Sequence, residues 1–138
     1  MAEPGETFSQ QVTLSEADIA DFARRCGDMN PLHHDRDYAA TTRFTRILAC
    51  GPHYTSLFMG LAATHFSKQG AMLGLEFNFN FRRPVLADDT ITLEWEVSDV
   101  LNKDSLGGEL IELSGKITNH LDKVVLTATG KVLVTPAL

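Results

Sequence analysis

Two different spacings of apolar residues divide the chain into a helical part and a strand part. In the first half, apolar side chains recur every three or four residues over residues 16–26 and again from Gly51 to about Ser67, which indicates amphipathic helices. From Gly74 onward, apolar and polar residues alternate, which is typical of strands with one buried face. The pattern therefore predicts helices first and a run of strands afterwards.

The helical part carries recognisable start and stop signals. A short strand is predicted for residues 8–14, and Ser15 with the acidic residues after it gives a capping-box start to the next helix. Gly27 is expected to end that helix as a C-terminal glycine. Asp35 is the expected N-cap of a short helix that follows. Pro52 suits the first turn of the long helix, where its missing N–H costs nothing.

The long helix has such a wide apolar surface that other elements must wrap most of it. The alternating part predicts strands, with a polar loop over 102–108 and a hairpin turn over 119–122; the strands are expected over residues 74–81, 91–97, 111–117 and 124–134. An early strand, a buried helix and then antiparallel strands predict an α+β hot-dog fold, in which a curved antiparallel sheet wraps a long central helix. The sheet edges would be exposed in a monomer, so we expect a homodimer.

Composition limits the function classes. The chain has 138 residues, 43% hydrophobic residues and a net charge of -6, which fits one globular domain over residues 1–138. It has no leader-like start and no apolar run near the roughly 18 residues of a membrane span, so we expect a cytoplasmic protein that does not bind membranes. Net acidity argues against nucleic-acid binding. Cys26 and Cys50 are expected to be small buried residues without a disulfide.

A carboxylate and an imidazole, Asp28 and His33, lie close together in a segment that cannot be helical. Gly27 stops the preceding helix, and Pro31 holds Asn30 in an extended conformation. Fully extended chain would separate the two side chains by roughly 17 Å, whereas a turn at Asn30 and Pro31 brings both within reach of one water molecule. The sequence therefore predicts an acid–base pair, with Asn30 positioning the loop.

The residues from Gly27 to Ala39 read GDMNPLHHDRDYA. They resemble the MaoC-like family of (R)-specific enoyl-CoA hydratases and 3-hydroxyacyl-thioester dehydratases, whose motif is G-D-x-N-P-x-H-x-D-x-x-Y-A. The later segment FNFRRPVLADDTI resembles the family's strand and turn after the central helix. The resemblance implies reversible hydration of trans-2-enoyl-CoA, or of the acyl-carrier-protein thioester, to the (R)-3-hydroxyacyl product without a metal or cofactor. It also implies that Asp28 and His33 act on water and that the Gly51 N–H meets the thioester oxygen.

The pair suits this chemistry. Adding water across a double bond conjugated to a thioester requires one group to take a proton from water and another to deliver one to the alpha carbon. Which of Asp28 and His33 is the base stays open at this point. Negative charge develops on the thioester oxygen, and free N–H groups at a helix start stabilise it. Gly51 lets the backbone approach closely, and His53 is a further candidate donor of an N–H.

Some residues near the predicted site depart from the family pattern. Where the family often has His-Gly-Met at the start of the central helix, this chain has Cys50, Gly51 and Pro52, followed by His53. Met59 stands where relatives carry a serine. These changes bear on the shape of the acyl pocket and on substrate preference.

Basic residues near the later motif are candidates for binding coenzyme A. Arg82 and Arg83, together with Arg43 and Arg46, are expected to meet its phosphates. A solvated charged edge is the alternative interpretation of each arginine.

Three other functions compete with the hydratase hypothesis. Hot-dog thioesterases commonly place a carboxylate on or beside the central helix, and residues 50–69 contain none. A non-catalytic acyl-thioester-binding subunit would keep the fold, but an intact Asp28 and His33 argue against it. A metal site is disfavoured because the spacing of the histidines and aspartates matches no compact ligand motif.

Overall fold

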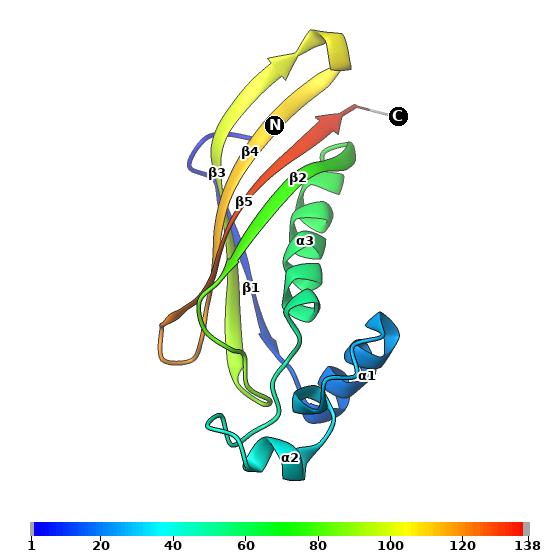
Figure 1. Cartoon of the computed structure of the whole chain (residues 1–138). Coiled ribbons are helices and arrows are strands. Elements are labelled where there is room, and N and C mark those ends of the chain that lie inside the picture. The colour runs from blue at the N-terminus through cyan, green and yellow to red at the C-terminus, as the bar shows by residue number, and fades with distance from the viewer. Residues whose placement is uncertain (1, 137–138) are drawn as a thin grey trace.

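A five-stranded antiparallel sheet curves around one long helix in the computed structural model, which describes residues 2–136 (Figure 1). The elements follow the order β1, α1, α2, α3, β2, β3, β4, β5. Their bounds are β1 Thr7–Thr13, α1 Glu16–Cys26, α2 Arg36–Ala40, α3 Gly51–Ser67, β2 Ala71–Phe81, β3 Thr90–Lys103, β4 Gly108–Thr118 and β5 Val124–Thr135. Short 3₁₀ turns cover Pro31–His33 and Asp104–Leu106.

The strands lie in the order β1-β3-β4-β5-β2, and each neighbouring pair is antiparallel. The sheet therefore ends in β1 on one side and in β2 on the other. Helix α3 lies against the concave face, while α1 and α2 gather at one end of the molecule (Figure 1). This arrangement is the predicted curved antiparallel sheet on a central helix.

The contact between α3 and the sheet centres on two aromatic side chains. Phe58 of α3 and Trp95 of β3 are fully buried, and their rings stack with centroids 3.9 Å apart. The Trp95 indole Nε1–H also donates a hydrogen bond of 2.9 Å to the Phe58 carbonyl. Buried aromatic pairs combine a large apolar area with a defined geometry. This contact therefore fixes both the depth and the rotation of α3 on the sheet.

Helix α3 is apolar but short. Within residues 2–136, the structure has no helix that is both long enough and apolar enough to cross a membrane.

Three details predicted from the sequence are wrong. The predicted loop over 102–108 is shorter than expected, because β3 and β4 continue as a hairpin to the pair Lys103 and Gly108 and only residues 104–107 form the turn. The hairpin tip is largely exposed, so it lacks the alternation that marks a half-buried strand. Strand β2 begins at Ala71 rather than Gly74. Cys26 is exposed, whereas Cys50 is buried as expected.

A fourth expectation, a buried apolar face on β2, holds only in part. Phe77 and Phe79 are partly buried and pack against the core, but Leu75 is 53% and Phe81 55% exposed. Leu75 lies at the register shift between Gly74 and Glu76, and Phe81 is the last residue of β2, so neither follows the regular alternation of the strand.

The glycine at position 115 provides a test of how closely α3 packs on the sheet. A Cβ at Gly115 would lie 2.5 Å from the Trp95 ring and 2.7 Å from the Phe58 ring. Both rings are fully buried and cannot move aside. We expect Gly115→Ala to lower the free energy of unfolding by about 1–3 kcal/mol in urea titrations.

The matched control is Gly60→Ala, in the middle of α3, where a Cβ meets nothing within 4 Å. Because alanine is favoured over glycine in a helix by about 1 kcal/mol, this variant should be at least as stable as the parent chain. Equal stabilities for the two variants would contradict the packing described here.

Candidate functional site

The end of α1 determines where Asp28 lies. The helix begins with the predicted capping box, in which the Ser15 hydroxyl accepts the Asp18 N–H at 3.1 Å. It ends at Gly27, which has φ 76° and so adopts the left-handed conformation predicted for it. The next N–H, that of Asp28, returns to the Ala23 carbonyl at 2.8 Å. The carboxylate of Asp28 therefore projects from a tightly closed helix end.

The loop after Asp28 is held by a series of short-range hydrogen bonds. Asp28 Oδ1 accepts the Asn30 N–H at 3.1 Å, and Asn30 Oδ1 accepts the Leu32 N–H at 3.1 Å. The Asn30 carbonyl then accepts the His33 N–H at 3.0 Å. Asn30 thus bonds to the loop through its N–H, its side-chain oxygen and its carbonyl, as expected for an asparagine that holds a turn.

Asp28 and His33 are brought into contact by this loop. Asp28 Oδ2 lies 3.2 Å from His33 Nε2, and the two side chains are 36% and 8% exposed. On the opposite side of the ring, His33 Nδ1 lies 2.7 Å from the Leu48 carbonyl oxygen. A carbonyl oxygen only accepts hydrogen bonds, so Nδ1 carries a hydrogen and Nε2 faces the carboxylate. The loop therefore sets the second ring nitrogen, Nε2, directly against the Asp28 carboxylate.

His34 supports the same loop from its other side. Its Nε2 lies 2.8 Å from the backbone carbonyl of Asp28, to which an imidazole N–H donates. The neighbouring histidine thus contacts the main chain of Asp28, while His33 contacts its side chain.

The start of α3 presents one free amide near the pair. The chain runs only three residues from Leu48 to Gly51, so it spans at most roughly 10 Å. Pro52 has no N–H, and the His53 N–H donates to the Cys50 carbonyl at 3.0 Å. His53 is therefore not the second N–H donor considered from the sequence. Within the described chain, the Gly51 N–H is the one that the first turn of α3 leaves for a ligand.

Cys50, the N-cap of α3, lies within electrostatic reach of the pair. Burial raises the pKa of its thiol, and the negative charge of Asp28 adds to the shift. The thiol therefore stays protonated at neutral pH and is a poor nucleophile.

His53 is a buried imidazole between α1 and α3. Its ring stacks on Phe22 of α1 with centroids 4.4 Å apart, and the residue is 7% exposed. Its Nδ1 is the one buried side-chain nitrogen or oxygen in residues 2–136 that has no hydrogen-bond partner. Burial lowers the pKa of His53, and the nearby Asp18 opposes that shift only in part. The ring is therefore neutral at pH 7 and joins the two helices that frame the loop.

The candidate phosphate-binding arginines have different surroundings. The Arg46 guanidinium donates to the Ala87 carbonyl and to Asp89 Oδ1, and Arg83 Nη1 donates to the Val124 carbonyl at 2.7 Å. The Arg43 guanidinium lies 4.9 Å from the centroid of the Phe44 ring. Arg82 is exposed at the end of β2. Arg46 is thus engaged with an acidic residue of the fold, whereas Arg82 projects into solvent.

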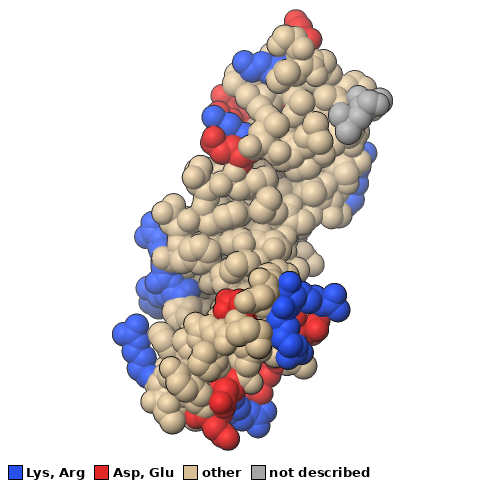
Figure 2. All heavy atoms as spheres, turned by 45° about the vertical axis from the view of Figure 1, so that its right-hand side comes forward, with Lys and Arg blue, Asp and Glu red and all other residues tan. Residues whose placement is uncertain are grey.

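Charged side chains are unevenly spread over the surface. On the face drawn in Figure 2, many charged side chains lie around the end that carries α1 and α2, others lie near the opposite end, and a broad, largely uncharged area lies between them. Helix α3 contributes to this area because it contains no Asp, Glu, Lys or Arg. Among residues 2–136, no three His, Cys, Asp or Glu side chains are grouped as a metal site requires.

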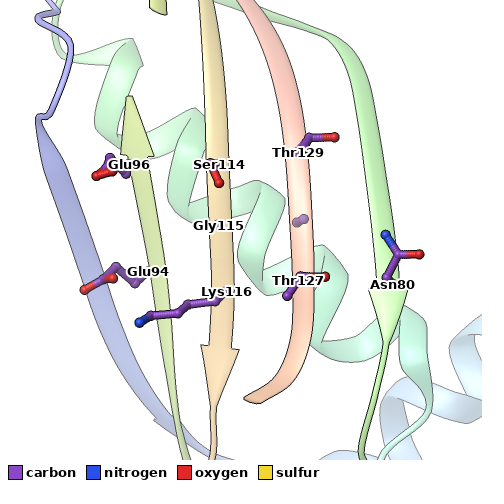
Figure 3. A pocket seen from close by; sticks show the side chains of 9 residues that line it. Asn80, Glu94, Glu96, Ser114, Gly115, Lys116, Thr127 and Thr129 are labelled. Atoms are coloured by element: carbon purple, nitrogen blue, oxygen red, sulfur yellow. The ribbon is translucent and has the colours of Figure 1, made fainter. Parts of the chain in front are cut away.

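A polar hollow of about 500 Å³ lies on the outer face of the sheet, and neither Asp28 nor His33 lines it (Figure 3). Its side chains stand on the strands with α3 behind the sheet; they include Asn80, Glu94, Glu96, Ser114, Lys116, Thr127 and Thr129. Glu94 and Lys116 are direct cross-strand neighbours. Opposite charges and hydroxyl groups in this register are typical of the solvent face of an antiparallel sheet.

Some features of the site were not found from the sequence. The Leu48 carbonyl fixes the His33 ring, but a backbone acceptor leaves no signal in the side-chain pattern. The alternation over 74–81 predicts a buried face but not that the Phe81 ring lies 3.0 Å from the position of a Cβ on Gly51. Tyr54 belongs to the wide apolar surface of α3; burial raises its pKa to about 12, so its hydroxyl remains protonated.

Comparison with known proteins identifies the class of fold. The structure superposes on the (R)-hydratase from A. caviae involved in PHA biosynthesis with a TM-score of 0.86 and 30% identity, over 96% of this chain and 97% of that chain. It also matches the unliganded R-hydratase PhaJ1 from Pseudomonas aeruginosa, with a TM-score of 0.87 and 28% identity, over 97% of this chain and 83% of that chain. The predicted hot-dog fold is confirmed.

Sequence comparison then identifies the family. The sequence model of the MaoC like domain matches residues 1–114, and the chain belongs to this family, as its motif predicted. It is 35% identical to the (R)-specific enoyl-CoA hydratase of Aeromonas caviae over 96 residues, which are 70% of this chain and 71% of that relative. It is 30% identical to the 3-hydroxybutyryl-CoA dehydratase of Methylorubrum extorquens over 72% of this chain and 62% of that relative. One relative is named as a hydratase and the other as a dehydratase, and both names describe hydro-lyase reactions.

The lowered pKa of His53 predicts how stability depends on pH. In the unfolded chain this imidazole binds a proton below its ordinary pKa of 6.5, whereas the folded state resists protonation. The unfolded state then holds more protons, so stability falls as pH drops below 6.5 until the lowered folded pKa is passed. We expect His53→Phe, which keeps the stack on Phe22, to lose less stability between pH 7.5 and 5.5 than the parent chain in urea titrations. Equal losses would show that the pKa of His53 is the same in the folded and unfolded states, and would contradict the prediction.

Proposed function

We propose that this protein catalyses the reversible hydration of a trans-2-enoyl thioester to the (R)-3-hydroxyacyl thioester, with Asp28 and His33 as the catalytic pair. The observation that carries the proposal is the 3.2 Å contact between Asp28 Oδ2 and His33 Nε2, with the ring fixed by the Leu48 carbonyl. Membership of a family whose matched relatives are named hydratases and dehydratases supports the same reaction.

Two titratable side chains that face each other fit this reaction. Hydration forms a C–O bond at the beta carbon and a C–H bond at the alpha carbon, while the attacking water loses one proton. A pair that holds one proton can accept the proton of water at one member and release a proton to the alpha carbon from the other. The pair ends in its starting protonation state, so the reverse reaction uses the same groups.

The Gly51 N–H is proposed to stabilise the negative charge that forms during the reaction. During the addition, negative charge builds up on the thioester oxygen. The N–H at the start of α3 stabilises that charge, helped by the partial positive charge of the 17-residue helix. Pro52 removes a competing donor from the same turn, so the developing oxyanion has a single backbone partner there.

Coenzyme A is the proposed carrier of the acyl group. Arg82 and Arg83 follow β2 directly, and Phe81 at the end of that strand contacts Gly51. Arginine binds phosphate through charge-assisted, often bidentate hydrogen bonds. A thioester held at Gly51 can therefore extend its phosphates toward the end of β2.

The working form is proposed to be a homodimer formed through the β2 edge. Strand β2 is unpaired on its outer side, and it exposes Leu73 and Leu75 by 43% and 53%. The outward side of α3 adds Met59 and no charged residue. An unpaired apolar edge is usually covered, and two antiparallel copies of one edge strand pair about a two-fold axis.

The reaction is tested by following the loss of the ultraviolet absorbance of the conjugated thioester with crotonyl-CoA, and then by chiral analysis of the product. Asp28→Asn and His33→Ala should each lower kcat by at least ~100-fold, because each removes one member of the proton-transfer pair. Circular dichroism should show the folded state unchanged.

Two surface variants serve as controls for these substitutions. Asp21→Asn removes a carboxylate from the exposed side of α1, and His120→Ala removes a half-exposed imidazole from the β4–β5 turn. Both should keep the parental kcat. Parental turnover in Asp28→Asn or His33→Ala would remove the pair from the mechanism, and free thiol in place of the hydroxyacyl product would identify a thioesterase.

The dimer proposal is tested by analytical ultracentrifugation. Leu75→Lys places a charge on the exposed part of the β2 edge and should shift the protein toward monomer. The control Leu121→Lys adds the same charge in the turn between β4 and β5, at a side chain that is 65% exposed. This variant should sediment like the parent chain. A monomeric parent protein at micromolar concentration would contradict the proposal.

A further inference from the structure

An aromatic ring stands at the entrance to the Gly51 amide. Two carbons of the Phe81 ring lie 3.0 and 3.1 Å from the position of a Cβ on Gly51, so the ring rests directly on the backbone of this turn. Phe81 comes from the end of β2 and is 55% exposed. It therefore forms a wall between solvent and the space behind Gly51.

The space behind Phe81 is filled by Tyr54. This residue lies three positions after Gly51 on α3, so both occupy the same side of the helix. The Tyr54 side chain is almost completely buried, with 4% exposure. Its ring meets the Phe81 ring edge to face, with centroids 5.9 Å apart and an interplanar angle of 71°.

Further rings occupy the next turn of α3. Phe58 lies four residues after Tyr54 and is fully buried, stacked on Trp95 at 3.9 Å and near Phe79 at 6.5 Å. The Trp95 indole is anchored to the Phe58 carbonyl, so these rings cannot move independently. The interface between α3 and the sheet therefore contains a continuous series of aromatic side chains, starting at Gly51.

We infer that Tyr54 and Phe81 limit the length of the acyl chain, and that the substrate is a short-chain trans-2-enoyl thioester such as the crotonyl thioester. This inference rests on the proposed function. A thioester oxygen at the Gly51 amide places the acyl carbons between that amide and the Asp28–His33 pair. Carbons beyond the double bond then meet Phe81 and Tyr54, and a longer chain enters only by displacing rings that are already close-packed.

The test compares kcat/KM for crotonyl-CoA and trans-2-octenoyl-CoA. The parent enzyme should favour the four-carbon substrate by at least ~10-fold, a discrimination within the range of an apolar pocket for added methylene groups. Tyr54→Ala should lower this ratio by about tenfold, because it opens the space behind Gly51. Phe81→Ala should lower it in the same direction; since Phe81 is half exposed, this variant retains the test even where Tyr54→Ala fails to fold.

Two matched variants separate pocket length from general loss of packing. Tyr54→Phe keeps the ring and should keep the parental ratio. Phe66→Leu shortens a fully buried aromatic side chain twelve residues farther along α3, where it packs against Phe8, and should also leave the ratio unchanged. A changed ratio in Phe66→Leu equal to that in Tyr54→Ala would overturn the assignment to Tyr54.

The outcomes distinguish this inference from the proposed function. Equal kcat/KM for the two substrates with the parent enzyme, or an unchanged ratio in both Tyr54→Ala and Phe81→Ala, would overturn the chain-length limit while leaving hydration intact. Absence of hydration with both substrates would instead overturn the proposed function and the inference with it.

Discussion

The short segment before α3 connects every part of the candidate site. The Leu48 N–H donates to the Leu32 carbonyl, and the Leu48 carbonyl accepts a hydrogen bond from His33 Nδ1–H. The following Ala49 N–H reaches the Val85 carbonyl, which ties the same segment to the connection between β2 and β3. Because these bonds are made in succession along one extended stretch, the imidazole, the start of α3 and the sheet cannot shift relative to one another independently.

This constraint gives His33 a fixed chemical character. A buried imidazole without the Leu48 carbonyl would be free to present either nitrogen to the carboxylate. With Nδ1 engaged by the Leu48 carbonyl, Nε2 is the ring nitrogen that faces Asp28. Asn30 Oδ1 accepts the Leu32 N–H, and the His34 ring contacts the Asp28 carbonyl. The loop is thus shaped by short-range bonds between side chains and the main chain.

Local signals were sufficient to predict most of the fold. Ser15, Gly27 and Asp35 each act through hydrogen bonds within a few residues, so their roles can be read from neighbouring positions. The approach of Asp28 to His33 was predicted for the same reason, since Pro31 forces the turn between them; the prediction placed one water molecule within reach of both, whereas the two side chains meet directly at 3.2 Å. Exposure of Phe81 and Leu75 was missed because it depends on where β2 ends and on a register shift between Gly74 and Glu76, which are set by pairing with β5.

Long-range features could not be inferred in this way. The hairpin formed by β3 and β4 extends past the core, where both faces meet water and alternation of residue type is lost. Cys26 occupies an apolar position of the helical repeat, yet it lies on the last turn of α1, where no other element covers it. The stack of Phe22 on His53 joins residues that are distant in sequence, and no local sequence pattern indicates that the two side chains meet.

The closed end of α1 also limits how the chain can diverge. Asp28 directly follows Gly27, which has the left-handed conformation. The direction in which the Asp28 carboxylate points therefore depends on the number of residues in α1. Deleting one residue from α1 would rotate that end by about 100° and draw it back by about 1.5 Å. Point substitutions on the solvent side of α1 are tolerated by this geometry, whereas single-residue insertions and deletions are not. Length variation among functional descendants of this sequence should instead accumulate at the exposed tip around Asp104–Leu106.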